Sequence, residues 1–341
     1  VFSYRANWQP AAQRPEAPRQ SLPIWLPEHA PLARVDASET ALSLTRLQQF
    51  FKAPAKQFLR QRLALRQPEI DAAGEDVEPL QVPQHGLDKH ALQQAVCAAL
   101  LTGETAAVML PRLRAQALLP AGPLGEQGLD AVVQRVRPYV DALRHWQAGQ
   151  AARTETLTCD IDGLRLHGSL HGIYPHGIAR LQFGERNGPS VLRSGLDWLL
   201  ACAAGLALPL MEFYDDKADG LGPHRRAPVP QDVAIAALRT LLAVRQQGLQ
   251  APLLFAPYSS WALFEAEDVE KGLKRAVNKW RGSERSWAEG RDAAYQLALR
   301  GQDPFSSHAR MADFACLSGS IFGLLTEAQI KEIEMGTLDV T

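Results

Sequence analysis

The chain has 341 residues, of which 46% are hydrophobic and 21% are charged, and its formal net charge at pH 7 is -1. This composition is typical of a globular protein and excludes a mostly disordered chain, and the length allows one large domain or two ordinary ones. The near-neutral charge excludes a broad basic field that would attract nucleic acid. Apolar runs are too short for a membrane-spanning helix, so we expect no membrane partner.

Residues 1–38 are rich in Pro, Gln and Ala and show no sustained period. Trp8 and Trp25 would be apolar anchors of an otherwise extended arm, which is typical of a linker between domains. We therefore predict an extended linker over 1–38, with further domains before it in a longer protein. Disorder over 1–20 is the alternative.

A helical part is predicted for residues 39–150. Ser43 is a suitable N-cap for a helix with one apolar face, and Pro54 should break or restart that helix. A loop is expected over 67–84. Helical periodicity returns in three segments, the last of which Pro138 should kink: 87–101, 104–119 and 125–147.

A mixed sheet core is predicted for 151–260. The alternating segments Thr154–Cys159 and Leu164–Leu170 flank a tight turn at Gly163 and form a strand pair, and Ile178–Phe183 forms a third strand. The pattern continues with a helix over 189–205, a strand over 208–214, a turn over 215–222, a helix over 231–248 and a short buried strand over 251–256. Helices are expected over 261–341. This order predicts a mixed α/β core with large helical insertions.

The strands around residue 175 have the shape of a nuclease active-site hairpin without its ligands. In nucleases of the restriction-endonuclease type, one strand ends in Asp and the next carries an acid, a spacer and a Lys, which together hold Mg²⁺ and assist the attacking water. The corresponding degenerate positions here are His171, Arg180 and Gln182. Because imidazole replaces a carboxylate poorly around Mg²⁺, we predict no catalytic residues at this hairpin.

Three further segments carry informative patterns. They are Ser-x₃-Leu-x₂-Phe-Phe-x₂-Pro over 43–54, Leu-Leu-Pro-Ala-Gly-x₂-Gly-Glu over 118–126, and Gln-Ala-Pro-Leu-Leu-Phe-Ala-Pro over 250–257 followed by Trp261. Together with the degenerate hairpin, their order and spacing resemble the C-terminal domain of the RecC family, the gamma chain of exodeoxyribonuclease V. The resemblance runs from about residue 40 to the end, which makes 39–341 one predicted nuclease-like domain.

The resemblance implies a subunit of the RecBCD helicase–nuclease, which processes double-strand breaks for recombinational repair in the bacterial cytoplasm, in association with the nucleoid. Its partners would be the RecB and RecD subunits, the double-stranded DNA end and single-stranded DNA. The family's domain is similar to a restriction-endonuclease-like (PD-(D/E)xK-type) nuclease but is inactive. We therefore expect no enzymatic activity, contact with RecD, and a contribution to the path where the duplex is split.

No cofactor or metal is expected. No Walker-type phosphate loop is present, and the four cysteines are too scattered for a zinc or iron–sulfur site. His167, His171 and His176 lie close together, but no Cys or acid completes a tetrahedral set, so we interpret them as surface or interface imidazoles.

Two alternatives come from other classes of protein. The first is a Mg²⁺-dependent exonuclease with displaced ligands, for which Glu126 is the candidate acid. The second is a single-strand-binding module that acts alone, which the near-neutral charge disfavours because such binding depends on counterion release.

DNA-binding candidates lie in two places. Arg225 and Arg226 follow a Gly-rich turn that could wedge at a fork, whereas a later helix carries basic residues beside an aromatic one: Lys274, Arg275, Lys279 and Trp280. The alternative for the helix is an ordinary solvated face, because acidic residues precede it. Interface anchors are expected among aromatic residues that otherwise belong to the core: Trp287, Tyr295, Phe305, Phe314 and Phe322.

Overall fold

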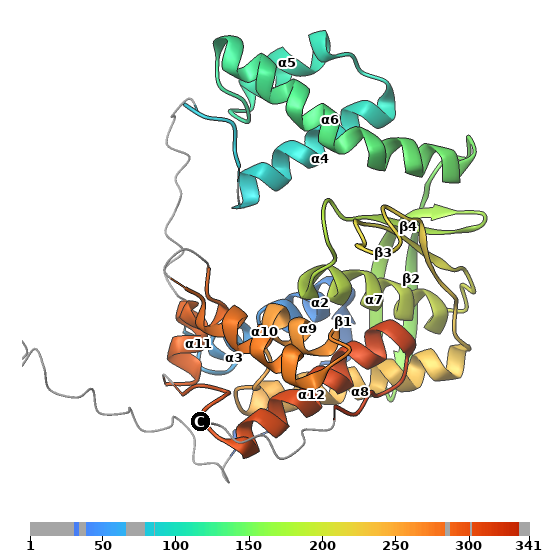
Figure 1. Ribbon diagram of the computed structural model, residues 1–341. Coiled ribbons are helices and arrows are strands. Elements are labelled where there is room, and N and C mark those ends of the chain that lie inside the picture. Colours follow the sequence, from blue (N-terminus) through green and yellow to red (C-terminus); the bar gives the residue numbers. More distant parts are fainter. Residues whose placement is uncertain are drawn as a thin grey trace, which may run out of the picture.

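The computed structural model describes residues 31–33, 39–65, 79–84, 86–283, 287–300 and 302–333. A mixed sheet lies between a large group of helices on one side and a separate three-helix unit near one end of its strands (Figure 1). The predicted linker over 1–38 falls outside the described residues except at 31–33, as does most of the predicted loop over 67–84. No helix in the described ranges is long and apolar enough to cross a lipid bilayer.

The folded part opens with a short strand and two helices: β1 (Ala41–Ser43), α2 (Leu44–Lys52) and α3 (Pro54–Arg62). The predicted N-cap is confirmed, because the Ser43 side chain accepts a hydrogen bond from the backbone N–H of Arg46 at 3.2 Å. Pro54 restarts the helix as predicted and occupies the first turn of α3, where a missing N–H costs nothing. Strand β1 was not predicted, since three residues are too few to show alternation.

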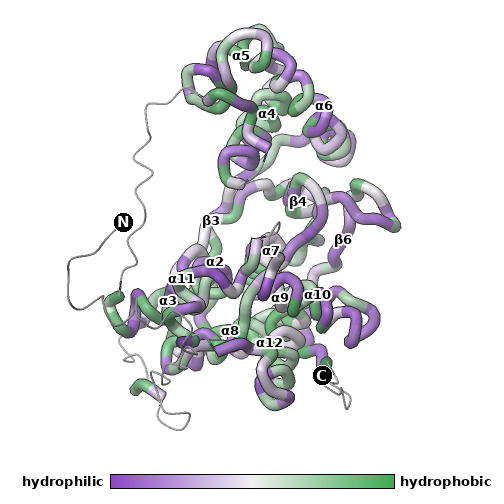
Figure 2. Tube along the Cα trace, turned by 60° about the vertical axis from the view of Figure 1, so that its left-hand side comes forward, coloured by the Kyte–Doolittle hydropathy of each residue, from purple (hydrophilic) through white to green (hydrophobic). Residues whose placement is uncertain are grey.

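The three predicted helices of the next segment are present as α4 (Gly86–Thr102), α5 (Ala106–Ala115) and α6 (Gly122–Gln147). They form a helical unit around a core of their own, in which Leu92, Val96 and Val136 are fully buried. Hydrophobic and hydrophilic positions alternate along each of these helices (Figure 2), as expected where every helix turns one face to its neighbours. The predicted helical part over 39–150 is therefore divided, because α2 and α3 pack on the sheet side of the molecule instead.

The central sheet contains β2 (Arg153–Ile161), β3 (Leu164–Tyr174), β4 (Gly177–Leu181), β5 (Leu210–Phe213) and β6 (His224–Arg226) in addition to β1. Strand β3 pairs antiparallel with β2 and β4 and parallel with β1; β4 pairs parallel with β5, and β5 antiparallel with β6. The turn between β2 and β3 has left-handed backbone at both Asp162 and Gly163, which matches the tight turn predicted there. Strand β6 was not predicted.

The buried strand predicted over 251–256 is wrong. The segment leaves α8 (Gln231–Gln250) and enters α9 (Pro257–Phe264) without pairing with any strand of the sheet. Its apolar residues fill the core as a connection between two helices, and Phe255 is 1% exposed. A short apolar run has the same appearance in a buried strand and in a buried connection, so its pattern could not separate the two.

Successive residues of β4 and β5 face opposite layers. Ile178 and Leu210 pack toward α7 (Gly188–Ala203), whereas Ala179 and Met211 pack toward α6. This alternation gives the sheet two covered faces at this end.

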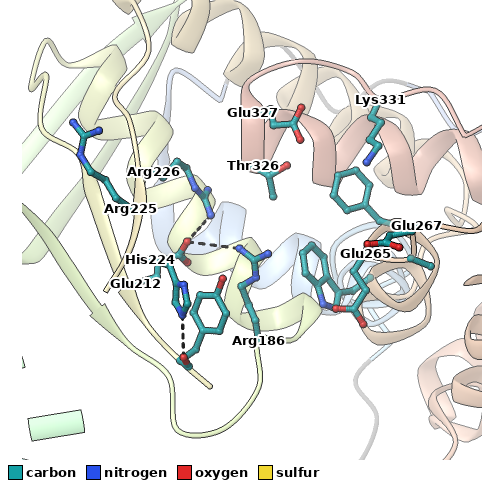
Figure 3. A pocket seen from close by; sticks show the side chains of 14 residues that line it. Arg186, Glu212, His224, Arg225, Arg226, Glu265, Glu267, Thr326, Glu327 and Lys331 are labelled. Atoms are coloured by element: carbon teal, nitrogen blue, oxygen red, sulfur yellow. Dashed lines mark hydrogen bonds and ion pairs between the residues drawn. The ribbon is translucent and has the colours of Figure 1, made fainter. Parts of the chain in front are cut away.

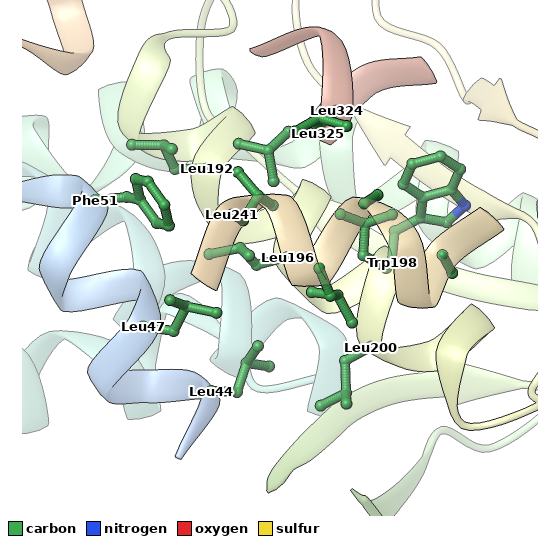
Figure 4. Close-up of a cluster of buried hydrophobic side chains, with 14 of the residues drawn as sticks. Leu44, Leu47, Phe51, Leu192, Leu196, Trp198, Leu200, Leu241, Leu324 and Leu325 are labelled. Atoms are coloured by element: carbon green, nitrogen blue, oxygen red, sulfur yellow. The ribbon is translucent and has the colours of Figure 1, made fainter. Parts of the chain in front are cut away.

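Helix α7 is the most enclosed element of the fold. Asn187 and Ser190 cap its start reciprocally, and all of its residues except Ser190 and Arg193 are buried. Helices α2, α8 and α12 (His308–Glu327) surround it (Figure 4) and contribute Leu47, Leu241 and Leu325 to a continuous apolar cluster.

A second apolar cluster is built around α3 by residues of α9, α10 (Val269–Arg281), α11 (Ala293–Ala298) and α12. The short 3₁₀ helix η2 (Glu289–Arg291) lies between α10 and α11 in the chain. Of the aromatic residues considered as interface anchors, four are buried: Tyr295, Phe305, Phe314 and Phe322. Trp287 is the exception, with 61% of its surface exposed.

Glu289 joins this cluster to the start of α9. It is 3% exposed and accepts hydrogen bonds from the backbone N–H groups of Tyr258 (3.1 Å) and Ser259 (2.7 Å) and from the Ser259 hydroxyl (2.8 Å). Burial raises the pKa of Glu289 to about 7, although its hydrogen bonds act in the opposite direction.

We predict that Gly195→Ala destabilises the fold. A Cβ atom at Gly195 would lie 2.6 Å from the carbonyl oxygen of Leu325 in α12, so α7 and α12 would have to separate. The free energy of unfolding should fall by about 1–2 kcal/mol in urea denaturation, despite the higher helix propensity of Ala. Arg193→Ala on the exposed face of α7 is the control, and an equal or smaller loss for Gly195→Ala would contradict the close packing.

The Glu289 carboxyl predicts a pH-dependent stability. Because its pKa is raised on folding, the folded state binds more protons than the unfolded state between about pH 4.5 and pH 7. The contribution of Glu289 to the free energy of unfolding should therefore fall as pH rises through this window, by at most about 1.4 kcal/mol per unit. Urea denaturation of the wild type and of Glu289→Gln across this pH range measures how the free energy of unfolding of each depends on pH. The same pH dependence in both proteins would contradict the raised pKa of Glu289.

Candidate functional site

Two of the three hairpin positions singled out in the sequence, His171 and Arg180, meet beneath α7. The Arg180 guanidinium on β4 donates to the Asp197 carboxylate of α7, with Nε–Oδ2 and Nη2–Oδ2 distances of 2.8 and 2.6 Å. Its Nη1 donates to the carbonyl oxygens of His171 (2.7 Å) and Ala179 (2.8 Å). Gln48 of α2 donates to the other Asp197 oxygen at 2.8 Å. Gln182 lies just beyond β4, where its backbone N–H donates to the carbonyl of Phe213.

This arrangement places the Arg180 guanidinium of β4 between the backbone of β3 and the Asp197 carboxylate of α7. The Arg180 and Asp197 side chains are 19% and 12% exposed, so their charges are largely removed from water and must neutralise one another. Both Asp197 oxygens are already hydrogen-bonded, which leaves the carboxylate poorly disposed to coordinate a metal ion.

A second carboxylate lies next to the first on the same face of the sheet. Glu212 of β5 is opposite Arg180 in the strand register and accepts hydrogen bonds from the Ser194 hydroxyl (2.6 Å) and from Arg226 (2.7 Å). Arg186 lies 3.9 Å from the same carboxylate. Figure 3 shows Arg186 and Arg226 pointing toward Glu212 from two sides.

The aromatic residues around Glu212 hold these arginines in place. The Arg186 guanidinium lies 4.9 Å from the ring centre of Tyr214 and 5.0 Å from that of Trp261, and Arg226 lies 5.2 Å from that of Trp198. Arg226 also donates to the carbonyl oxygen of Leu325 in α12. Burial lowers the pKa of Arg226, and the charge of Glu212 opposes that shift.

A cavity of about 390 Å³ opens beside this cluster between β6, α9 and the end of α12. Its lining carries equal numbers of acidic and basic side chains: Glu212, Glu265, Glu267 and Glu327 against Arg186, Arg225, Arg226 and Lys331. Burial raises the pKa of Glu265. The balance of charge does not favour a nucleic-acid backbone in this cavity.

Two of the predicted DNA-binding residues, Arg226 and Trp280, have little exposed surface in the structure. The Arg226 side chain is 11% exposed and its donors are directed at Glu212 and Leu325, so it has no free edge for a phosphate. Trp280 is 6% exposed and packs against Tyr295 and the backbone at Gly290, so no base could stack on it.

The other candidates are on the surface. Arg225, Arg275 and Lys279 are exposed, whereas Lys274 is paired with Glu270 at 2.6 Å, one helical turn away. Glu270, in the first turn of the same helix, therefore engages part of the basic run, as the solvated-face alternative requires.

Two of the three neighbouring histidines, and the candidate acid Glu126, have other partners in the structure. His171 contacts the Thr154 hydroxyl at 2.9 Å, and His176 packs on the Trp146 ring. Glu126 pairs with Arg114 in the helical unit, roughly 20 Å along α6 from Tyr139, the residue that touches Phe183 near the end of β4. In the described ranges, no three His, Cys, Asp or Glu side chains form a metal-binding group.

Sequence reasoning missed Asp197 and Glu212. These two acids arise from α7 and β5, outside the β3–β4 hairpin. A signal was available, because each is the one acidic residue in an otherwise apolar buried element. A buried charge in such a setting requires a partner.

We predict that Arg180→Met destabilises the fold, because it leaves the Asp197 carboxylate without its cation in a site that water hardly reaches. The free energy of unfolding should fall by about 2–4 kcal/mol in urea denaturation. The matched control is Arg165→Met, which breaks the exposed pair with Asp160 and should cost less than about 1 kcal/mol. Equal losses for the two variants would show that the Arg180 pair is no stronger than a surface pair.

Comparison with known proteins agrees with this architecture. The family model of the RecC C-terminal domain matches residues 39–268. The RecBCD enzyme subunit RecC of Escherichia coli (strain K12) is 26% identical over 325 residues, which cover 90% of this chain and 27% of that protein. The chain thus spans about a quarter of the length of this relative. With the family model matching more than half of its length, the chain belongs to the RecC C-terminal domain family.

Proposed function

We propose that this chain is a non-catalytic structural and DNA-guiding part of a RecC subunit, acting within a RecBCD helicase–nuclease during repair of double-strand breaks in the bacterial cytoplasm. The relative is itself named a RecBCD enzyme subunit, which supports assembly with RecB and RecD. The observation that carries the non-catalytic part of the proposal is the Arg180–Asp197 pair.

The order of elements supports descent from a restriction-endonuclease-like core. Helix α2 precedes the antiparallel strands β2, β3 and β4, and α7 then crosses to β5, which is parallel to β4. In a nuclease with this arrangement, the carboxylates between α2, β3 and β4 would hold Mg²⁺ and position the attacking water.

Here a guanidinium supplies the positive charge that a metal ion would bring, but it cannot activate water. Arginine stays protonated at physiological pH and has no open coordination site, so it neither lowers the pKa of a water molecule nor accepts a proton. The pair therefore preserves the electrostatic balance of the ancestral site without its chemistry. A domain of this kind remains useful as a rigid surface for partner subunits and for DNA.

Co-purification tests the assembly part of the proposal. Tagged chain co-expressed with full-length RecD, and separately with RecB, from the same organism should retain RecD through size-exclusion chromatography. The Gly195→Ala variant, which loosens the fold without altering exposed side chains, is the control for non-specific capture. Failure to retain either subunit would contradict the assembly proposal.

A cleavage assay tests the non-catalytic part. Linear duplex and single-stranded DNA should stay intact with Mg²⁺ or Mn²⁺, and Glu126→Ala should behave like the wild type. Metal-dependent cleavage by the wild type that is lost in Glu126→Ala would contradict the non-catalytic proposal. It would support the alternative of an exonuclease with displaced ligands.

A further inference from the structure

Two aromatic side chains are exposed together at the start of α9. Trp287 is 61% exposed and Tyr258 is 36% exposed, and their ring centres are 5.2 Å apart with an interplanar angle of 74°. Leaving two large rings in water forgoes the free energy of burying them, so an exposed aromatic pair points to a ligand that covers it.

The pair stands on a rigid base. Tyr258 is held through its backbone N–H by the buried Glu289 carboxylate, which also binds the N–H and hydroxyl of Ser259. Trp287 precedes Ala288 and Glu289, both of which are buried. The rings are therefore presented by fixed backbone and would lose little freedom on binding a flat partner.

Two exposed cations lie on α7 and α2, and α7 begins directly against α9, because a Cβ atom on Gly188 would meet the carbonyl oxygen of Pro257. Arg193 is exposed on α7, and Lys52 is exposed at the end of α2. Gln48, one turn before Lys52, donates to the carbonyl oxygen of Arg193 at 3.4 Å, which brings the last turn of α2 against this part of α7. Across the described ranges, neither Lys52 nor Arg193 takes part in a salt bridge.

The charges of these cations also act on the pKa values of Tyr258 and His90. Burial raises the pKa of the Tyr258 hydroxyl, with Arg193 acting in the opposite direction. Burial also lowers the pKa of His90 on α4, and the charges of Arg193 and Lys52 lower it further. We call Trp287, Tyr258, Arg193 and Lys52 together the aromatic–basic strip.

The strip leads to the degenerate nuclease position. Asp197 lies one turn beyond Arg193 on α7, and Gln48 contacts both residues. A strand lying along the strip would therefore approach the Arg180–Asp197 pair, where the charges are already balanced and no metal-binding group is formed by the described residues.

We propose that the aromatic–basic strip binds single-stranded nucleic acid, with bases stacked on Trp287 and Tyr258 and phosphates neutralised by Arg193 and Lys52. The inference rests on the DNA-guiding role proposed above and names the surface that performs it. Every base has a face that stacks on an aromatic ring, so such a site accepts any sequence. Duplex DNA is disfavoured, because its bases are already stacked on one another. The two cations, which form no salt bridge with any described residue, favour a polyanion over an apolar protein surface.

Fluorescence anisotropy of a labelled thymidine oligonucleotide of about 20 residues tests this site in the full chain. Trp287→Ala should weaken binding about ten-fold, because one stacked base is lost. Leu124→Ala is the matched control, since Leu124 is 60% exposed on the distant helical unit. Arg193→Gln should weaken binding and reduce the slope of log K against log salt by about 0.7, the value for one phosphate of a single strand. Arg165→Gln is its control.

Two outcomes would overturn the inference. The first is an oligonucleotide affinity that is absent in the wild type, or that is unchanged in both Trp287→Ala and Arg193→Gln. Circular dichroism must show that both variants are folded. The second is loss of RecD or RecB capture in Trp287→Ala with oligonucleotide affinity intact, which would make the aromatic pair a subunit contact. If RecD is retained while the oligonucleotide result fails, the proposed assembly role survives and only the strip is rejected. Tight oligonucleotide binding without capture of either subunit would instead reject assembly alone.

Discussion

The burial of α7 on nearly every side is the constraint on which the rest of the structure depends. A helix enclosed by the sheet and by α2, α8 and α12 has almost no position at which a polar side chain reaches water. Its few polar residues must therefore find partners inside the protein, because an unpaired buried charge costs several kcal/mol, of the order of 3–5. The close contact of Gly195 with Leu325 shows how little room remains around it.

The buried arginines follow from that constraint. Asp197 and Ser194 lie on the sheet-facing side of α7, and Arg180 and Glu212 face them from adjacent strands. In a nuclease, carboxylates in such a position are balanced by a metal ion that exchanges with solvent. Here the balancing charges are covalently part of the chain, so the site remains closed and stable whether or not metal is present. These paired residues thus contribute to the stability of the core.

The polar groups left on the surface are distributed unevenly. Around β6 and the end of α12, acids and bases alternate and offset one another. The last turn of α2 and the exposed edge of α7 carry exposed cations, and the start of α9 carries exposed aromatic rings. Arg193 belongs to this second surface because it is one of the two residues of α7 that are not buried, which links the packing of the helix to the proposed path of a single strand.

Local pattern determined most of the elements of this protein: the N-cap at Ser43, the restart at Pro54, the helices of the helical unit and the tight turn at Gly163 all depend on near neighbours in the chain. Motif spacing also identified the family. The pattern could not separate a buried connection at 251–256 from a strand, nor foresee β1, because both depend on which distant segment lies alongside. The pairing of Arg180 with Asp197, the burial of Arg226 and Trp280, and the exposure of Trp287 beside Tyr258 were decided only by the tertiary structure. Each joins residues from separate elements, and burial of an individual side chain is a property of the assembled layers, not of its neighbours in sequence.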